Sequence, residues 1–385
     1  MENMDLLFER KYPVKIMMGK GILNKVKTHL IPFLSEPRLV IITNPLLKKL
    51  YANNLTVELT KYNIEVHTIL VADGEKTKSL NTTKKIFDSL TEWKVNRSTT
   101  LITLGGGVIG DLGGFIAATF MRGLPLIHIP TTLLAQIDSS IGGKVALNHA
   151  NAKNIIGSFY HPRIILTDSQ VLQSLPIRQL KNGLVEAIKI AIVSSSYFFG
   201  WLENNIELIL KKDEEGLDFL IKKAVQLKID LILNDPWENN TNNQRKYLNL
   251  GHTIGHAWEV IGGYNRISHG EAIALGILME TKIAYDLGIC SEEFQQRVKK
   301  IFSLLFNSLP SQSFFSFLFQ SIREGKRIEN RKINFDTFWD ILTLDKKNSE
   351  GKVTFILPEK LGRVCLIDYL SREEIKKFLK DFILP

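Results

Sequence analysis

Two different spacings of apolar residues divide the chain. Up to about residue 175, short runs rich in β-branched residues alternate with helical stretches such as residues 80–93. Strands that alternate with helices in this way predict a parallel sheet with helices packed on its faces. The runs that we expect to form strands are PRLVIITN, IEVHTILVA, TTLITLGG, LPLIHIP and RIILTD.

From Pro176 onward the apolar positions recur mostly with the period of an amphipathic helix. The expected helices are SLPIRQLKNGLVEAIKIAIV, EEGLDFLIKKAVQLKIDLIL, HGEAIALGILMETKIAYDLG and SREEIKKFLKDF. Pro176 suits the first turn of the first of these helices and marks a domain boundary there. We therefore predict an α/β domain with a parallel sheet over residues 1–175 and an all-α domain over residues 176–385.

Composition narrows the class of protein. A chain of 385 residues with 44% hydrophobic content is long enough for two cores. No run reaches the roughly 18 uncharged apolar residues of a membrane helix, and MENMDLLFERK carries acids where a signal peptide would be basic. We expect a soluble, cytoplasmic protein. Its two cysteines are too few for a disulfide scaffold or a structural zinc cluster.

The formal net charge of +9 raises the question of nucleic-acid binding. Many lysines stand near acids in helical segments, which is typical of solvated helix faces. Zinc-finger spacing, an RNA-binding signature and an arginine-rich arm do not occur in the sequence. We therefore expect anionic small molecules as ligands and neither nucleic acid nor membrane as a partner.

A glycine-rich segment, STTLITLGGGVIGDLGGF, predicts a strand, a glycine turn and a helix. Gly105, Gly107 and Gly110 match the spacing G-x-G-x-x-G, which by itself is a weak sign of nucleotide binding. An ordinary dinucleotide fold also needs an acid about 20 positions further on, and none occurs between Asp111 and Asp138. The turn therefore either binds a phosphate or packs a helix against the sheet.

Histidines in the second half are candidate metal ligands. His252 and His256 are four residues apart, so both rings lie on one helix face, and His269 follows in ISHGEAIALG. Helical histidines near a carboxylate suit zinc or a similar divalent ion, although this is not the H-E-x-x-H spacing. Spacing alone favours His252 and His256 as the pair, and the alternative is that these are ordinary core or surface histidines.

Glu186 and Lys189 are three residues apart on an otherwise apolar helix. They could form a structural ion pair or belong to a binding site. Further polar residues upstream, Asp138, Lys144, Lys153 and Asn154, favour the second alternative. A structural explanation would need a separate partner for each buried charge, whereas one phosphate-binding pocket accounts for all of them.

Long motifs occur through most of the chain, namely GGGVIGDLGGF, PTTLLAQIDSSIGGK, NHANAKNIIGSFYHP, GLVEAIK, LNLGHTIGHA, SHGEA and LDKKNSEGKVTFILP. Through these motifs the chain resembles the 3-dehydroquinate synthases, within the sugar phosphate cyclases, over most of its length. The resemblance implies an NAD-binding α/β domain and a helical domain that holds a divalent metal, usually zinc and alternatively cobalt. It also implies an active site between the domains and a homodimer.

Residue by residue, the resemblance implies metal ligands at Glu186, His252 and His269, which replaces the pair favoured by spacing. It implies NAD contacts at Asp73, Gly74, Glu75, Lys78, Gly107, Val108, Ile109, Gly110, Asp111, Thr131, Thr132, Lys144, Lys153, Val171, Leu172, Gln173 and Ser174. It implies substrate contacts at Asp138, Lys144, Asn154, Lys189, Lys228, Arg245, Asn249, His256 and one of Lys346 and Lys347. Arg122 is expected to reach the site of the partner subunit.

The implied reaction converts 3-deoxy-D-arabino-heptulosonate 7-phosphate to 3-dehydroquinate and phosphate, in the shikimate pathway to aromatic amino acids. It consists of transient oxidation by NAD, phosphate elimination, reduction and an intramolecular aldol closure, and it makes the protein a carbon–oxygen lyase. Val145 departs from the family, which usually has threonine there, whereas Arg245 and Asn249 favour an acidic substrate.

Three alternatives remain at this point. The first is a related cyclase that acts on another sugar phosphate. The second is a metal-dependent polyol or alcohol dehydrogenase, and the third is a binding protein without activity. The set of Glu186, His252 and His269 argues against a site that has decayed.

Overall fold

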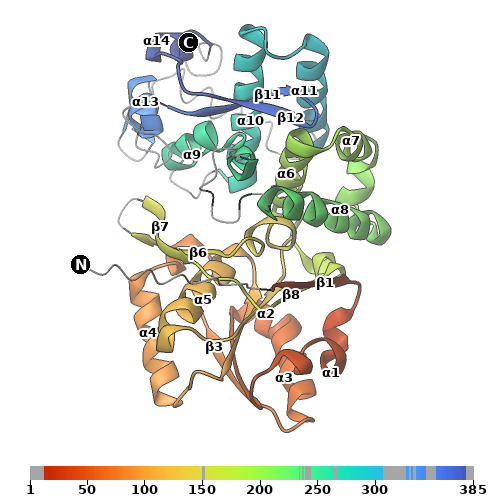
Figure 1. The fold of residues 1–385 in the computed structure, drawn as a ribbon, viewed down its shortest axis with the longest axis vertical. Coiled ribbons are helices and arrows are strands. Elements are labelled where there is room, and N and C mark those ends of the chain that lie inside the picture. Colours follow the sequence, from red (N-terminus) through yellow and green to blue (C-terminus); the bar gives the residue numbers. More distant parts are fainter. Residues whose placement is uncertain are drawn as a thin grey trace, which may run out of the picture. The chain divides into compact units, whose positions relative to one another are not determined.

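The computed structural model describes residues 13–149, 152–233, 235, 238, 244–262, 267–306, 327–328, 331–332, 335–343 and 353–378. The chain forms two compact units, Met1–Gln173 and Ser174–Pro385 (Figure 1). The first unit is built around a parallel sheet and the second is mainly helical, so the predicted combination of an α/β and a helical domain is confirmed.

The sheet of the first unit has six strands in the order β1-β8-β5-β4-β2-β3, and all its pairings are parallel. The strands are β1 (Lys15–Gly19), β2 (Arg38–Thr43), β3 (Glu65–Leu70), β4 (Thr100–Gly105), β5 (Leu126–Pro130) and β8 (Ile164–Asp168). The last five coincide with the five runs expected from the sequence. The edge strand β1 lies outside those runs.

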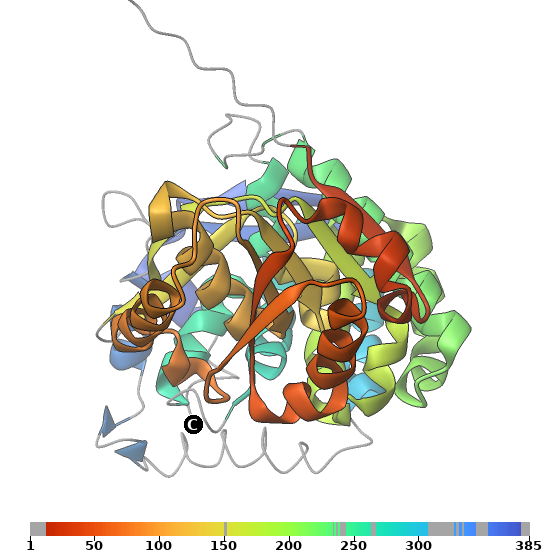
Figure 2. The ribbon, with the colours of Figure 1, turned by 90° about the horizontal axis from the view of Figure 1, so that it is seen from below.

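Helices cover both faces of this sheet because successive strand residues point to opposite sides. Val40 and Ile42 of β2 pack in one core with α4 (Leu80–Glu92) and α5 (Gly107–Thr119). Leu39 and Ile41 pack in the other core, with α1 (Val26–His29) and α3 (Asn53–Thr60), an arrangement that can be followed in Figure 2. Strands buried on both faces explain the nearly continuous apolar runs.

The chain reverses its direction of travel across the sheet between β2 and β4. From β2 it moves outward to β3, and then returns to place β4 on the other side of β2. In parallel α/β sheets, ligands bind beyond the carboxyl ends of the strands at such a point. The glycine turn directly follows β4, so the topology and the sequence motif indicate the same place.

Shorter elements complete the first unit. An antiparallel hairpin of β6 (Lys144–His149) and β7 (Ala152–Phe159) stands apart from the main sheet. The remaining elements are α2 (Pro45–Leu47), η1 (Ile22–Asn24), η2 (Ile31–Phe33), η3 (Lys48–Ala52), η4 (Glu75–Thr77), η5 (Phe120–Arg122), η6 (Ala135–Ser139) and η7 (Ser169–Ser174). The last of these ends at the first residue of the second unit.

The second unit contains the helices that the 3.6-residue period predicts. The four expected runs correspond to α6 (Ile177–Ser194), α8 (Glu214–Leu233), α10 (His269–Asp286) and α14 (Arg372–Phe378), and the histidine spacing falls on α9 (His252–Ile261). Further helices that no expected run covered are α7 (Ser196–Leu210), η8 (Gln244–Asn249), α11 (Glu292–Phe306) and α13 (Phe335–Thr343). Small antiparallel pairs add to them, namely β9 (Arg327–Ile328) with β10 (Arg331–Lys332), and β11 (Phe355–Lys360) with β12 (Arg363–Ile367). The helical periodicity did not indicate these strands.

Two central helices organise this unit. Every residue of α6 from Leu180 to Val193 is buried, because neighbouring elements surround the helix. The other central helix, α10, packs against α6, α9, α11 and β11. No helix in the described part of the chain has both the length and the apolar character that a membrane crossing requires.

Candidate active site

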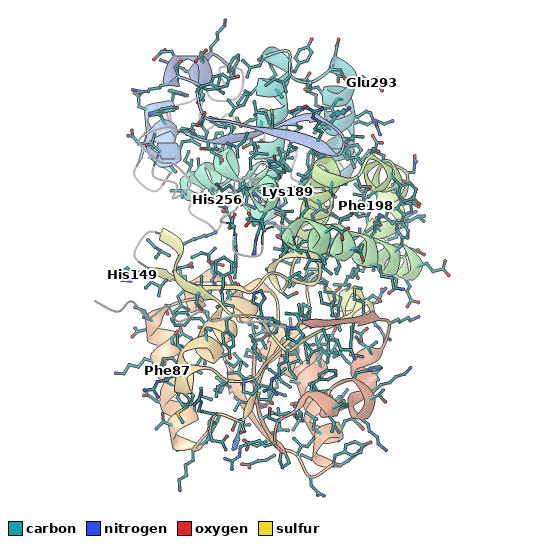
Figure 3. All side chains as sticks on the ribbon, viewed as in Figure 1. Phe87, His149, Lys189, Phe198, His256 and Glu293 are labelled. Atoms are coloured by element: carbon teal, nitrogen blue, oxygen red, sulfur yellow. The ribbon has the colours of Figure 1, made fainter. Side chains whose placement is uncertain are left out.

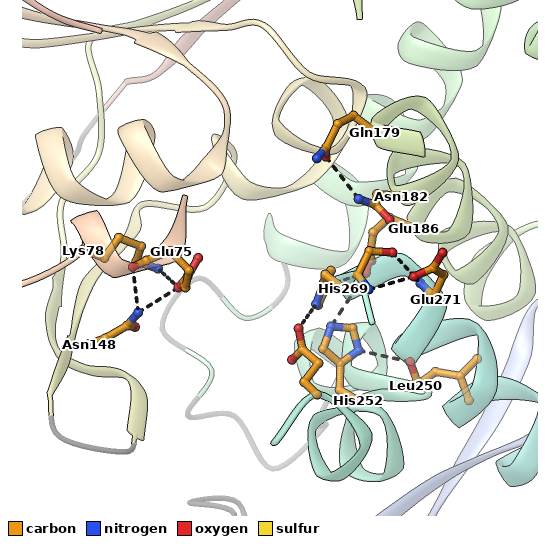
Figure 4. A network of polar contacts seen from close by, with 12 residues as sticks. Glu75, Lys78, Asn148, Gln179, Asn182, Glu186, Leu250, His252, His269 and Glu271 are labelled. Atoms are coloured by element: carbon orange, nitrogen blue, oxygen red, sulfur yellow. Dashed lines mark hydrogen bonds and ion pairs between the residues drawn. The ribbon is translucent and has the colours of Figure 1, made fainter. Parts of the chain in front are cut away.

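Three side chains of the second unit converge on one point. Glu186 lies in the middle of α6, while His252 and His269 are the first residues of α9 and α10. Each offers one ligand atom, and these atoms all lie within 4.8 Å of one another (Figure 4). Oε1 of Glu186 is 3.2 Å from Nε2 of His269 and 3.8 Å from Nε2 of His252.

Local structure fixes where the two histidines begin their helices. Gly251 precedes His252 with a positive φ of 79°, a conformation that glycine adopts without steric cost. Ser268 precedes His269 and forms a capping box, in which its hydroxyl accepts from the backbone of Glu271 and the Glu271 carboxylate accepts from the backbone of Ser268. Both rings therefore stand at well-defined helix starts.

Hydrogen bonds at Nδ1 set the orientation of each ring. Nδ1 of His252 lies 3.2 Å from the carbonyl oxygen of Leu250, and Nδ1 of His269 lies 3.3 Å from Oε1 of Glu259. These contacts leave the two Nε2 atoms directed at Glu186. Partners of this kind commonly hold metal-binding histidines in one tautomer.

The charges around His269 are mainly negative. Burial alone would lower its pKa, but the carboxylates of Glu259 and Glu186 reverse the effect and raise the pKa to about 10. A metal that binds here would have to displace this proton. On the other side, Oε2 of Glu186 is paired with the buried ammonium of Lys189. Two imidazoles and a carboxylate are the donor set that zinc and similar divalent ions accept, so the residues fit a metal.

The geometry distinguishes between the two histidine pairs considered from the sequence. The rings of His252 and His256 do lie close together, with centroids 5.3 Å apart in an edge-to-face arrangement. The second histidine nitrogen in the cluster with Glu186 and His252, however, belongs to His269 and not to His256. The shared helix face of the first pair was therefore a poor guide to the cluster, and the set implied by the family resemblance is the one that the fold brings together.

Cationic side chains are buried on the elements around the cluster. Lys189 on α6, Lys228 on α8 and Arg245 on η8 are all less than 7% exposed. These three elements pack against one another, and η8 also carries Asn249, whose amide donates to Glu238 at 3.2 Å. Figure 3 shows Lys189 on α6 and His256 on α9. Buried lysine and arginine side chains are suitable donors for phosphate and carboxylate groups.

A small, partly open pocket lies at the glycine turn of the first unit. It is lined by Thr103, Gly105, Gly106, Gly107, Gly110, His128, Pro130, Ala135, Ser139 and Ser140. A Cβ atom at Gly105 would lie 2.4 Å from the side chain of Ile109, and one at Gly107 would lie 3.0 Å from Ser139. Side chains at these positions would therefore crowd the turn or the pocket.

The amino terminus of α5 opens at this turn. Its N-cap residue is Gly106, which has no side chain to accept the first backbone N–H groups of the helix. Free N–H groups and the positive end of the helix dipole favour a phosphate. The turn also lies at the point where the chain reverses across the sheet. These features fit the diphosphate of a dinucleotide.

A polar network in the same unit joins Lys78 to several predicted site residues. The Lys78 ammonium donates to Asp111 at 2.6 Å and to the side chain of Asn154 at 2.5 Å. It also lies 3.5 Å from the Glu75 carboxylate, a contact that Figure 4 shows. Burial alone would lower the pKa of Lys78, but Asp111 and Glu75 more than offset this and raise it. The ammonium therefore stays charged.

The other predicted residues of the first unit differ in how their side chains are placed. Ile109 and Leu172 are buried in the core, so only their backbone could meet a ligand. The exposed residues are Asp73, Gly74, Arg122, Lys144, Gln173 and, just beyond the unit, Ser174. The buried residues are Thr131 and Val171, and the half-buried ones are Val108, Gly110, Thr132, Asp138 and Lys153. Lys346 and Lys347 lie outside the described residues.

Sequence reasoning missed three polar residues next to these sites. His128 of β5 lines the glycine pocket, Glu259 supports His269, and Asn148 of β6 contacts Glu75. His128 is buried, its Nδ1 is 2.6 Å from the Thr103 hydroxyl, and burial lowers its pKa to about 4. The sequence could have indicated His128, because a histidine within the apolar run LPLIHIP is unusual. Glu259 and Asn148 could be identified only from their tertiary contacts.

Solved structures with the same fold include two sugar phosphate cyclases. A 2-epi-5-epi-valiolone synthase from Streptomyces hygroscopicus, with NAD+ and Zn2+ bound, matches with a TM-score of 0.84 at 24% identity over 99% of each chain. A 2-deoxy-scyllo-inosose synthase, complexed with carbaglucose-6-phosphate, NAD+ and Co2+, matches with a TM-score of 0.79 at 24% identity. That match covers 95% of this chain and 96% of the other. At 24% identity, the similarity to these two structures shows that the chain has the same fold.

Sequence comparison identifies the family as well as the fold. The family model of the 3-dehydroquinate synthase N-terminal region matches residues 68–182, and that of the C-terminal region matches residues 183–348. The 3-dehydroquinate synthase of Thermodesulfovibrio yellowstonii is 38% identical over 377 residues, which cover 97% of this chain and 98% of the relative. The N-terminal model covers the glycine turn, and the C-terminal model covers the cluster of Glu186, His252 and His269. The chain belongs to the 3-dehydroquinate synthase family.

Proposed function

We propose that this protein converts 3-deoxy-D-arabino-heptulosonate 7-phosphate to 3-dehydroquinate and inorganic phosphate. The reaction breaks a carbon–oxygen bond to phosphate and closes a carbocycle by forming a carbon–carbon bond, so the enzyme is a lyase without net redox change. Membership of the 3-dehydroquinate synthase family supports this proposal. The biosynthetic role also favours the cytoplasm as its compartment.

The observation that carries the proposal is the convergence of Glu186, His252 and His269 beside Lys189. We propose that these three residues hold a divalent metal, most simply Zn2+, with Co2+ as an alternative. When bound, the metal would supply Lewis-acid stabilisation of negative charge on substrate oxygens. Lys189 would keep the Glu186 carboxylate ionised and directed, because its ammonium pairs with the oxygen that faces away from the histidines.

We assign the NAD site to the first unit and the metal and much of the substrate site to the second, with residues 1–175 and 176–385 as the two domains. NAD would supply reversible hydride transfer at an alcohol carbon of the substrate. The α5 amino terminus would bind its diphosphate through backbone N–H groups, and the small residues at Gly105 to Gly107 would let the cofactor approach the backbone.

The remaining polar residues are proposed to bind and orient the substrate. Lys189, Lys228 and Arg245 supply buried positive charge, which suits the phosphate and the carboxylate of the substrate. Asn249 and His256 add hydrogen bonds within the same unit. Asp138, Lys144 and Asn154 of the first unit stay proposed contacts, as does one of Lys346 and Lys347. The homodimer and the contribution of Arg122 to a partner's site also remain proposals from the family resemblance.

The test is an assay of inorganic phosphate with NAD and a divalent metal present. The purified protein should release phosphate from the heptulosonate phosphate, and absorbance at the NADH wavelength should show no steady rise, because the hydride returns to the product. Sedoheptulose 7-phosphate and glucose 6-phosphate serve as parallel substrates. Neither presents the carboxylate for which Arg245 and Asn249 are proposed.

Each alternative has its own result in this assay or in a separate measurement of bound NAD and metal. Faster phosphate release from one of the two parallel sugar phosphates would identify a related cyclase and would contradict the proposed substrate. Steady accumulation of NADH would indicate a metal-dependent dehydrogenase instead. Failure to bind NAD or metal would favour a binding protein without activity.

A further inference from the structure

Asn148, near the end of β6, makes hydrogen bonds to the η4 turn, to Lys78 directly after that turn and to β7 of its own hairpin. Its side-chain Nδ2 donates to Oε1 of Glu75 at 2.9 Å. Its Oδ1 accepts from the backbone N–H of Asn154 at 2.9 Å. Its own backbone N–H donates to the carbonyl oxygen of Lys78 at 2.9 Å. One residue therefore contacts three residues that belong to the proposed cofactor and substrate sites.

The two ends of the Asn148 amide meet partners of opposite kinds. The Glu75 carboxylate can only accept a hydrogen bond, so it requires the NH2 group, and the backbone N–H of Asn154 can only donate, so it requires the carbonyl oxygen. Aspartate at position 148 would retain the bond to Asn154 but would place a second carboxylate against Glu75. Alanine would lose both bonds.

Asn154 depends on this support because its backbone is left-handed, with a φ of 53°. A residue other than glycine occupies this region at a cost, although asparagine tolerates it better than most. The Asn148 oxygen accepts the N–H of Asn154 in that conformation, and the Asn154 side chain in turn accepts from the Lys78 ammonium. Asn148, Glu75, Lys78 and Asn154 thus form a closed ring of contacts.

Glu75 also depends on its neighbours to remain ionised. Burial by itself would raise the pKa of this carboxyl group, but the Lys78 charge and the hydrogen bond from Asn148 outweigh burial, and the pKa lies below its usual value. The amide of Asn148 therefore helps to hold a charged carboxylate at a fixed place beside Lys78.

We propose that Asn148 is a positioning residue, which sets the Glu75 carboxylate for the cofactor and the left-handed backbone of Asn154 for the substrate. The inference rests on the proposed function, since it takes Glu75 and Lys78 as cofactor contacts and Asn154 as a substrate contact. Asn148 itself acts through these residues.

The experiment compares Asn148→Ala, Asn148→Asp, Glu75→Gln and the double variant Glu75→Gln with Asn148→Asp. The Kd for NAD is measured by calorimetry, and the KM for the sugar phosphate and kcat are measured by phosphate release. Both single changes at position 148 should weaken NAD binding at least about tenfold, the effect of losing one hydrogen bond to a charged group. Asn148→Asp should raise the KM less than Asn148→Ala, since it keeps the bond to Asn154.

The double variant exchanges donor and acceptor. The amide introduced at position 75 can donate to the carboxylate introduced at position 148, so the double variant should lose less NAD affinity than the losses of Glu75→Gln and Asn148→Asp added together. Two independent losses of stability would add, so they cannot produce such a coupling.

Asn96→Ala is the matched control in the same unit. The Asn96 amide also donates to a carboxylate, Glu36, and accepts from a backbone N–H, that of Ser98, but at an exposed place away from η4. Its replacement should leave the Kd for NAD unchanged.

The outcomes separate this inference from the proposed function. Wild-type protein that binds no NAD would overturn both. Wild-type protein that binds NAD, with Asn148→Ala equal to it in Kd and KM, would overturn the role of Asn148 alone. A double variant whose loss equals the sum of the two single losses would likewise overturn the proposed contact with Glu75, even if the alanine variant fails to fold.

Discussion

The carboxylate of Glu186 lies 3.2 Å from Nε2 of His269, although 83 residues separate the two along the chain. A second carboxylate, Glu259, lies 3.3 Å from Nδ1 of the same ring. The imidazole is therefore held between two acids, one on α6 and one on α9. A ring held in this way presents a fixed nitrogen to a metal, and the second carboxylate makes that nitrogen more basic.

His269→Ala should remove most of the bound metal and nearly all turnover, because it deletes one of three proposed ligands. His256→Ala, on the neighbouring ring, should keep the metal and raise the KM for the sugar phosphate instead. Metal content of the desalted proteins, measured by mass spectrometry, distinguishes the two. A His269→Ala protein with its full metal content would rule out the proposed ligand set.

Glu259→Gln should lower metal affinity by about 10- to 100-fold, the usual effect of removing a carboxylate that supports a histidine ligand. Competition with a coloured chelator measures the affinity directly, without an activity assay. The exposed Glu293 on α11 provides the same substitution as a control, and Glu293→Gln should not change the affinity. Equal affinities in the two variants would show that Glu259 does not act on the metal.

Gly276→Ala should destabilise the second unit by about 3 kcal/mol, at the upper end of the usual cost of overpacking. The added methyl carbon would lie 1.9 Å from the carbonyl oxygen of Gly251, a backbone atom directly before His252. Helices α9 and α10 would have to separate, so metal affinity should fall as well. Urea unfolding and chelator competition measure the two effects.

The control for this change is another helical glycine. A Cβ atom at Gly200 in α7 meets nothing within 4 Å. Gly200→Ala should therefore leave stability unchanged or raise it by up to about 1 kcal/mol, because alanine favours the helix. If both alanine variants unfolded at the same urea concentration, the close contact between the two helices would not be a constraint.

His128 makes stability depend on pH in a defined window. Its pKa is about 4 in the folded protein against 6.5 for the free side chain, because burial disfavours the charged ring. Above pH 6.5 both states are neutral, and as the pH falls from 6.5 to 4 only the unfolded chain gains the proton, so stability is lost. Between about pH 7 and pH 5 this amounts to roughly 2 kcal/mol.

His128→Asn removes this titration while an amide replaces the ring near the Thr103 hydroxyl. The variant should therefore lose less stability than the wild type between about pH 7 and pH 5, whatever its stability at neutral pH. Urea unfolding at the two pH values gives the comparison. A variant with the same pH dependence as the wild type would show that His128 accepts its proton in the folded state.

The sequence by itself determined most of the main helices and strands and the types of chemistry, although β1 and the short strands of the second unit were not among them. The β-branched runs around Val40 and Ile102 indicated buried strands, and the 3.6-residue period around Glu186 and Lys189 indicated a helix, because these patterns depend on near neighbours. The long motifs determined the family for the same reason, since each is a continuous stretch whose residue types are readable without a fold.

Only the tertiary structure decided which of these residues meet. Spacing favoured His256 as the companion of His252, yet His269 completes the cluster with Glu186, because α9 and α10 both begin beside the middle of α6. The order of the strands, the pocket beside His128 and the contacts of Asn148 with Glu75 and Asn154 were likewise absent from any local pattern. Contacts between distant residues follow from how the helices and strands pack, and packing is a property of the whole folded unit.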